Sequence, residues 1–129
     1  MANNLDKYTT VGEIDKQIAE QVGFFYEGTI YMAPGVKKHI KKRHSHELSE
    51  NILSNLEKYI QLIVNEPDYI GAHPTKGGDT MEFIKELSPN ILVSIAIDIK
   101  NNYIYVSSLY PITNAKLAKG LENNRFKKV

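Results

Sequence analysis

The stretch ILVSIAIDIKNNYIYVSSLY, residues 91–110, determines the fold class of this chain. Isoleucine or valine occupies every second position from 91 to 99, which is typical of a strand with one buried face. Asn101-Asn102 indicates a two-residue hairpin turn, and Tyr103–Tyr110 alternates as the returning strand. Because Ile104 and Val106 match the apolar face of the first strand, we expect helices to cover that face.

Helices and further strands are predicted on both sides of this hairpin. Apolar residues recur at helical spacing in residues 11–22, after a Thr10–Glu13 capping box, and again in residues 48–65. Thr113 caps a last helix that ends near residue 123. Residues 29–32 and 81–87 are β-rich, and residues 72–79 read as a loop.

We therefore predict an α+β fold in which N-terminal helices precede an antiparallel four-stranded β-meander and a short C-terminal helix. Residues 1–28 are predicted to be a helical extension packed on a core domain of residues 29–129.

The composition is that of a soluble globular protein of 129 residues, with 42% apolar and 24% charged residues. We expect a cytoplasmic protein without a membrane span or signal peptide, since neither pattern is present. The absence of cysteine excludes disulfides, zinc–thiolate sites and thiol nucleophiles. The formal net charge of +1 hides two basic clusters, at residues 37–43 and 116–128, a distribution typical of nucleic-acid sites.

The first basic cluster lies in a predicted helix, PGVKKHIKKRH at residues 34–44. Val36 and Ile40 share one face of this helix, and the borders of that face carry His39, Arg43 and His44. The opposite face carries Lys37, Lys38, Lys41 and Lys42. One interpretation is a surface helix with solubilising lysines. The other is a phosphate or nucleic-acid site, because histidine moves protons near neutral pH and arginine binds phosphate through paired hydrogen bonds.

A candidate site follows if this helix packs on the hairpin. Ser108 and Tyr110 continue the face of Ile104 and Val106, so His39 and Arg43 would approach them. Such a set suits metal-independent RNA cleavage, which needs a base, an acid and a cation for the phosphate.

Other readings of the polar and aromatic residues are less specific. His44, His46, His73 and Glu47 match no known metal-ligand spacing, and Lys76-Gly77-Gly78 lacks the context of a phosphate-binding loop, so neither a metal site nor a P-loop is predicted. Several tyrosines could stack on bases or simply pack: Tyr59, Tyr69, Tyr103 and Tyr105.

Three segments taken together resemble the phage-associated branch of the barnase–EndoU–colicin–RelE-like nuclease superfamily. They are IYMAPGV at residues 30–36 running into His39 and Arg43-His44, IVNEPDYIG at residues 63–71, and IYVSSLY at residues 104–110. The resemblance covers residues 29–128 and implies helices followed by a four-stranded antiparallel sheet, with residues 29–129 as the nuclease domain.

The resemblance also implies a metal-independent ribonuclease of toxin or phage type that needs no cofactor. Its functional positions would fall on His39, Arg43, His44 and a hydroxyl of the last strand. Where we expect a threonine in that strand, this chain has Ser107-Ser108. Ser108 is the better match, because Tyr110 follows it by two places.

The resulting hypothesis is an endoribonuclease that attacks through the ribose 2′-hydroxyl and leaves a 2′,3′-cyclic phosphate. His39 and His44 would be base and acid in an open order, Arg43 would stabilise the charged intermediate, and Ser108 and Tyr110 would orient the substrate. RNA is the expected partner, and an immunity or antitoxin protein is a second candidate. The residues expected to hold the nucleic-acid backbone are Lys37, Lys38, Lys41, Lys42 and Lys127. The alternative is a non-catalytic phage-encoded module that binds nucleic acid or protein on the same fold.

Overall fold

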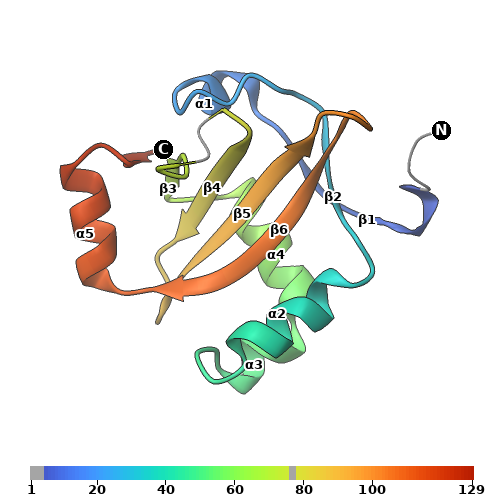
Figure 1. Ribbon diagram of the computed structural model, residues 1–129. Coiled ribbons are helices and arrows are strands. Elements are labelled where there is room, and N and C mark those ends of the chain that lie inside the picture. The colour runs from blue at the N-terminus through green and yellow to red at the C-terminus, as the bar shows by residue number, and fades with distance from the viewer. Residues whose placement is uncertain (1–4, 76–77) are drawn as a thin grey trace.

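The computed structural model describes residues 5–75 and 78–129, which form a seven-stranded sheet with helices on both faces (Figure 1). The strand order is β1-β2-β6-β5-β4-β3-β7, and every neighbouring pair is antiparallel except the parallel pair β2–β6. The elements in chain order are η1 (Leu5–Lys7), β1 (Thr9–Glu13), α1 (Lys16–Glu20), β2 (Thr29–Met32), α2 (Val36–His44), α3 (Glu50–Ser54), α4 (Leu56–Asn65), β3 (Tyr69–Gly71), β4 (Thr80–Lys85), β5 (Asn90–Asp98), β6 (Tyr103–Ile112), α5 (Asn114–Glu122) and β7 (Phe126–Lys128).

The predicted α+β class is confirmed, whereas the predicted four-stranded meander is replaced by this larger sheet. Strands β3 and β7 have three residues each, which is too short for alternation to reveal them. The last helix begins where predicted, because the Thr113 hydroxyl accepts a hydrogen bond from the Lys116 backbone N–H at 3.1 Å. Residues 76 and 77 of the predicted loop lie outside the described residues.

The N-terminal segment differs from its prediction because residues 9–13 form an edge strand. β1 pairs with β2, for example Thr10 with Tyr31, so the predicted Thr10–Glu13 capping box does not form. The helix begins instead after Asp15, whose side chain accepts from the Ile18 N–H at 3.2 Å. Residues 1–28 therefore supply a strand of the sheet as well as a short helix, and residues 1–4 of the predicted extension lie outside the described part of the chain.

The predicted helix at residues 48–65 is two helices, α3 and α4, separated at Asn55. The backbone of Asn55 lies outside the helical region, with φ −133° and ψ 34°. Its side chain donates to the Asn51 carbonyl at 2.8 Å, the kind of local bond by which asparagine competes with helical geometry.

Two apolar clusters hold helices against opposite faces of the sheet. On one face, α4 supplies the fully or nearly fully buried side chains Leu56, Ile60, Ile63 and Val64 to the larger core. On the other face, α5 lies toward the β3–β7 end of the sheet (Figure 1), and its core is Ile84, Leu92, Ile112, Leu117 and Phe126. The rest of the α5 face is free to form a site.

The β5–β6 hairpin forms as predicted but contains a bulge that changes its faces. Ser94 pairs with Ser108, whereas Ile95 pairs with Val106, so Ser107 is an extra residue on β6. Beyond the bulge Leu109 joins the core on the α4 face, and Ser108 and Tyr110 turn to the α5 face. The prediction that Ser108 and Tyr110 share the face of Ile104 was therefore wrong.

The hairpin turn is also longer than predicted. It spans residues 99–102, with Asn102 at a positive φ of 53°. Ile99, predicted to lie on the buried face, is 62% exposed in this turn.

Candidate active site

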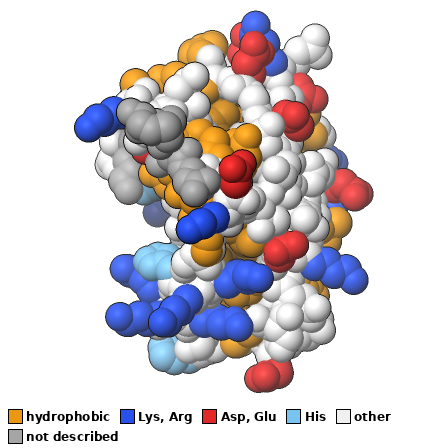
Figure 2. Space-filling model, turned by 90° about the vertical axis from the view of Figure 1, so that its right-hand side faces the viewer, with side chains coloured by type: hydrophobic (Ala, Val, Ile, Leu, Met, Phe, Trp, Pro, Cys, Tyr) orange, Lys and Arg blue, Asp and Glu red, His pale blue; other side chains and the backbone are white. Residues whose placement is uncertain are grey.

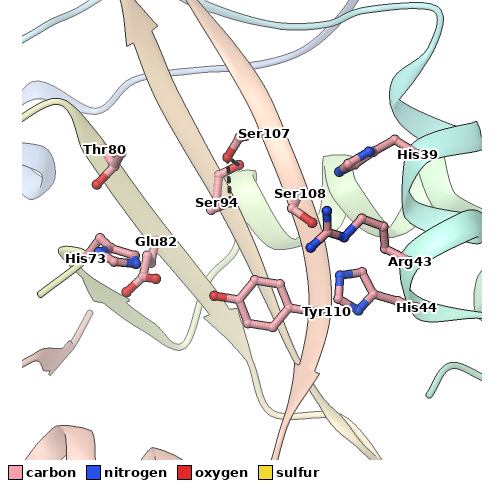
Figure 3. Close-up of a pocket in the computed structure, with 10 residues that line it drawn as sticks. All are labelled: His39, Arg43, His44, His73, Thr80, Glu82, Ser94, Ser107, Ser108 and Tyr110. Atoms are coloured by element: carbon pink, nitrogen blue, oxygen red, sulfur yellow. Dashed lines mark hydrogen bonds between the residues drawn. The ribbon is translucent and has the colours of Figure 1, made fainter. Parts of the chain in front are cut away.

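A cleft of about 440 Å³ opens on the α5 face of the sheet (Figure 3). Its floor is a polar row in which Glu82 of β4 pairs with Ser94 of β5, and Ser94 pairs with Ser108 of β6. The Ser94 and Ser107 hydroxyls are 2.6 Å apart, so the bulged residue is tied to the floor. In the next row, the sheet becomes apolar and passes under α5. The cleft is thus the part of this face that α5 leaves uncovered.

Helix α2 forms one wall of the cleft because β2 leaves β6 early. β2 pairs with β6 only at Ile30–Ile104 and Tyr31–Tyr105, and α2 then contacts β6 in its place. Ile40, which is fully buried, anchors the helix to the larger core. The cleft lining includes five residues that the sequence predicted as catalytic: His39, Arg43, His44, Ser108 and Tyr110.

His44 is the most tightly held of the α2 residues. Its Nδ1 lies 2.7 Å from the Glu47 carboxylate, and its ring stacks on Tyr110 with the ring centroids 5.6 Å apart. A carboxylate can only accept a hydrogen bond, so Nδ1 carries a proton and donates it to Glu47. Nε2 is then the nitrogen left for proton transfer, an arrangement in which a carboxylate fixes the histidine tautomer.

Arg43 and His39 are exposed and directed toward the floor of the cleft (Figure 3). Within the described residues, neither side chain has a hydrogen-bond or ion-pair partner. A guanidinium without an acidic partner is available to bind an anion such as a phosphate.

At the β4 end of the floor, Glu82 forms an ion pair that the sequence did not predict. Glu82 is only 1% exposed, and the Arg125 guanidinium binds both of its carboxylate oxygens, with Nη2 at 2.9 Å from Oε2 and 3.1 Å from Oε1. An acid inside the apolar run MEFI, residues 81–84, was a signal that a partner was needed. That partner is 43 positions away, which no local pattern reveals.

His73 forms the opposite wall of the cleft, across from α2 (Figure 3). From the sequence it was considered only as a possible metal ligand. Its Nδ1 accepts a hydrogen bond from the Thr75 backbone N–H at 3.2 Å, so its proton is on Nε2. No group of three or more His, Cys, Asp or Glu side chains in the described part of the chain is arranged to hold a metal ion.

Tyr110 spans the cleft between the two walls. Burial raises the pKa of its phenol, the negative charge of Glu82 raises it further, and Arg125 partly offsets the effect. The phenol therefore stays protonated at neutral pH and can donate a hydrogen bond to a bound oxygen.

The lysines predicted to hold nucleic acid fall into two separate places. Lys37, Lys38, Lys41 and Lys42 are exposed on α2, where basic and histidine side chains gather on one surface (Figure 2). Lys37 also faces Glu57, with Nζ 3.7 Å from the carboxylate. Lys127 lies on β7 at the far edge of the sheet, and its Nζ donates to the Gln21 carbonyl at 3.0 Å. The structure does not bring Lys127 together with the α2 lysines.

Comparison with known proteins gave one family match. The model of the family described as "phage-Barnase-EndoU-ColicinE5/D-RelE like nuclease3" matches residues 9–119, which begin at β1 and include the whole α2 wall and the serine floor. No curated protein and no solved structure matched the chain significantly. No helix in the described residues has the length and apolar character needed to cross a membrane.

Proposed function

Because this chain belongs to the phage-associated Barnase-EndoU-ColicinE5/D-RelE-like nuclease family, we propose that it is an endoribonuclease and that the cleft is its active site. The observation that carries the proposal is the convergence of His39, Arg43 and His44 from one helix onto a floor of hydroxyl groups. The reaction is attack of a ribose 2′-oxygen on the adjacent phosphorus. The new O2′–P bond replaces the P–O5′ bond, which leaves a 2′,3′-cyclic phosphate and a 5′-hydroxyl.

The two histidines transfer the protons in this proposal. His44 is the base, because Glu47 holds its Nδ1–H and leaves Nε2 to accept the proton of the 2′-hydroxyl. His39, on the same wall one turn before Arg43, is the acid that protonates the leaving 5′-oxygen. Every proton is accounted for within the two side chains and the RNA, so the step requires no metal ion.

Arg43 supplies positive charge where negative charge develops. Its guanidinium, which has no partner among the residues that the structure describes, binds the two non-bridging oxygens of the pentavalent phosphorus through paired hydrogen bonds. Ser108 and the protonated phenol of Tyr110 donate hydrogen bonds that orient the phosphate or the ribose. The exposed α2 lysines, which lie outside the cleft, hold the RNA backbone where it leaves the site.

The test is incubation of the purified protein with total cellular RNA in EDTA, beside two variants of matched thermal stability. His44→Ala removes the proposed base, whereas His46→Ala removes an exposed histidine of the same segment that does not line the cleft. We expect fragments with cyclic-phosphate ends from the wild type and from His46→Ala, and a loss of about 100-fold or more in rate for His44→Ala. Intact RNA in every reaction, or equal loss in both variants, would refute the proposal.

A non-catalytic RNA-binding role is the second candidate, favoured by the lysine face of α2 that points away from the cleft. Binding of that kind weakens steeply as salt rises, because it is driven by release of counterions. Recovery of intact RNA together with such a salt dependence would support this role instead.

A further inference from the structure

Four tyrosines form a connected strip on the sheet, next to the cleft. Tyr103 and Tyr105 are on β6, Tyr31 is on β2, and Tyr8 directly precedes β1. The Tyr103 ring is the centre of the strip. Its centroid lies 5.6 Å from that of Tyr105, 5.9 Å from that of Tyr8 and 6.5 Å from that of Tyr31. We call these residues the tyrosine strip.

The tyrosine strip lies on the same face of the sheet as the cleft. Tyr103 and Tyr105 alternate with Ile104 and Val106, which point into the core on the α4 face. Tyr31 is the register partner of Tyr105 and shares its face. Tyr105 precedes the bulged Ser107 by two residues, a distance of about 7 Å along a strand. The strip therefore continues the floor of the cleft toward β1, the end of the sheet that α5 does not cover (Figure 1).

Phe25 gives the strip a feature that internal packing does not explain. This phenylalanine, in the segment between α1 and β2, is 72% exposed. Together with Tyr31 and Tyr103 it lines a hollow of about 390 Å³. Among the described residues that line this hollow, the charged one is Glu27, and there is no lysine or arginine. A ligand held here would be bound through aromatic faces and polar edges rather than through phosphate charge.

We propose that the tyrosine strip and Phe25 bind the unpaired bases of a single-stranded RNA whose scissile phosphate lies in the cleft. This inference rests on the proposed ribonuclease function. Nucleic-acid bases stack on aromatic side chains whatever their sequence, and the bases of a duplex are already stacked and paired. The enzyme would thus select single-stranded RNA, with its lysines binding backbone along α2 and its aromatic side chains binding bases beyond the cleft, toward β1.

The experiment measures binding of intact RNA, so it does not depend on turnover. Fluorescence anisotropy follows a labelled single-stranded oligoribonucleotide of about 12 nucleotides, a length in the range of single-strand site sizes, and the same sequence as a duplex. All proteins carry His44→Ala so that the RNA stays intact. Phe25→Ala and Tyr105→Leu remove stacking surfaces, and Phe25→Ala does so at an exposed position. Tyr105→Phe keeps its ring, and Val129→Ala removes an exposed apolar side chain adjoining the far edge strand of the sheet.

We expect Phe25→Ala and Tyr105→Leu each to weaken single-strand binding by about 5- to 140-fold, which corresponds to about 1–3 kcal/mol per stacked base. Tyr105→Phe and Val129→Ala should bind like the parent, and duplex binding should be weaker and unaffected. Unchanged single-strand affinity in both Phe25→Ala and Tyr105→Leu would overturn the inference, as would an equal loss for the duplex. A wild type that cuts no RNA, with the stacking losses present, refutes the ribonuclease proposal alone. If the wild type cleaves RNA but Phe25→Ala and Tyr105→Leu bind single strands like the parent, only the inference that the tyrosine strip binds bases is refuted.

Discussion

The Phe126 side chain lies between two glycines, Gly120 of α5 and Gly71 of β3. The substitution Gly120→Ala therefore tests how tightly α5 packs against the sheet. Phe126 is 4% exposed and belongs to the smaller core. A Cβ added at Gly120 would overlap the Phe126 ring, and one added at Gly71 of β3 would meet the same ring at 2.5 Å. The ring is therefore enclosed between α5 and the sheet and has no room to withdraw.

Two opposing effects set the magnitude. Alanine in place of a helical glycine would by itself stabilise the helix by about 1 kcal/mol. Overpacking a filled core costs about 1–3 kcal/mol, and the upper part of that range applies because both sides of the ring are closed. The net expectation is a loss of about 1–2 kcal/mol. With an unfolding entropy of about 2.1 cal/mol/K for each of the 129 residues, the melting temperature should fall by about 4–7 °C.

Thermal unfolding followed by circular dichroism would measure this for Gly120→Ala, Phe126→Leu and the double variant. Phe126→Leu removes the ring that the new methyl group meets, so Gly120→Ala should cost much less in that background. A higher melting temperature for Gly120→Ala alone would refute the reasoning. So would single effects that simply add in the double variant, because the two side chains would then not be in contact.

Three further predictions concern the cleft, the lysines and the tyrosine strip. Arg43→Ala should lower the cleavage rate about 100- to 1000-fold, because the guanidinium stabilises negative charge in the transition state. It should not lower the melting temperature, because the side chain is exposed. Single-turnover assays measure the rate, and thermal unfolding measures the melting temperature. Replacing Lys41 and Lys42 by glutamine should reduce the slope of log affinity against log salt by about 0.7 for each phosphate that the protein no longer neutralises, measured on single-stranded RNA. Burial raises the pKa of Tyr103 from 10.0 to about 12. The contribution of this phenol to the stability of the folded state is therefore complete below pH 10 and is lost as the pH rises toward 12. Denaturant unfolding should show that Tyr103→Phe is less sensitive to pH over that window, and an identical sensitivity would contradict the assignment.

Local patterns were sufficient for much of the fold. The alternation at residues 91–99 and 103–110 identified β5 and β6, and Thr113 marked the start of α5, because each signal depends on neighbours in the sequence. The family resemblance is confirmed by the match over residues 9–119. The segment at residues 11–22 misled because Ile14 and Ile18 do pack against the core, but from a strand end and a short helix rather than from one helix.

The candidate site was predictable on one wall only. His39 and Arg43 are one turn apart, and Arg43 and His44 are adjacent, so a helix necessarily presents them near one another. The floor depended on the extra residue at Ser107, and a bulge leaves no mark in an alternating sequence. Glu82 and Arg125 meet through the sheet and the α5–β7 connection, so their pairing follows from tertiary structure rather than from spacing.

The parallel pairing of β2 with β6 affects when the candidate site can assemble during synthesis. Ile30 pairs with Ile104, which is made 74 residues later, and the floor serines and Arg125 also come after position 93. While the ribosome is still making the middle of the chain, α2 is a basic segment with no hydroxyl floor to act on. Contacts of such long range also form slowly compared with local ones. We expect the proposed ribonuclease to be unable to cleave ribosomal RNA while it is being made, and to acquire activity only when β6 has left the ribosome and joined the sheet.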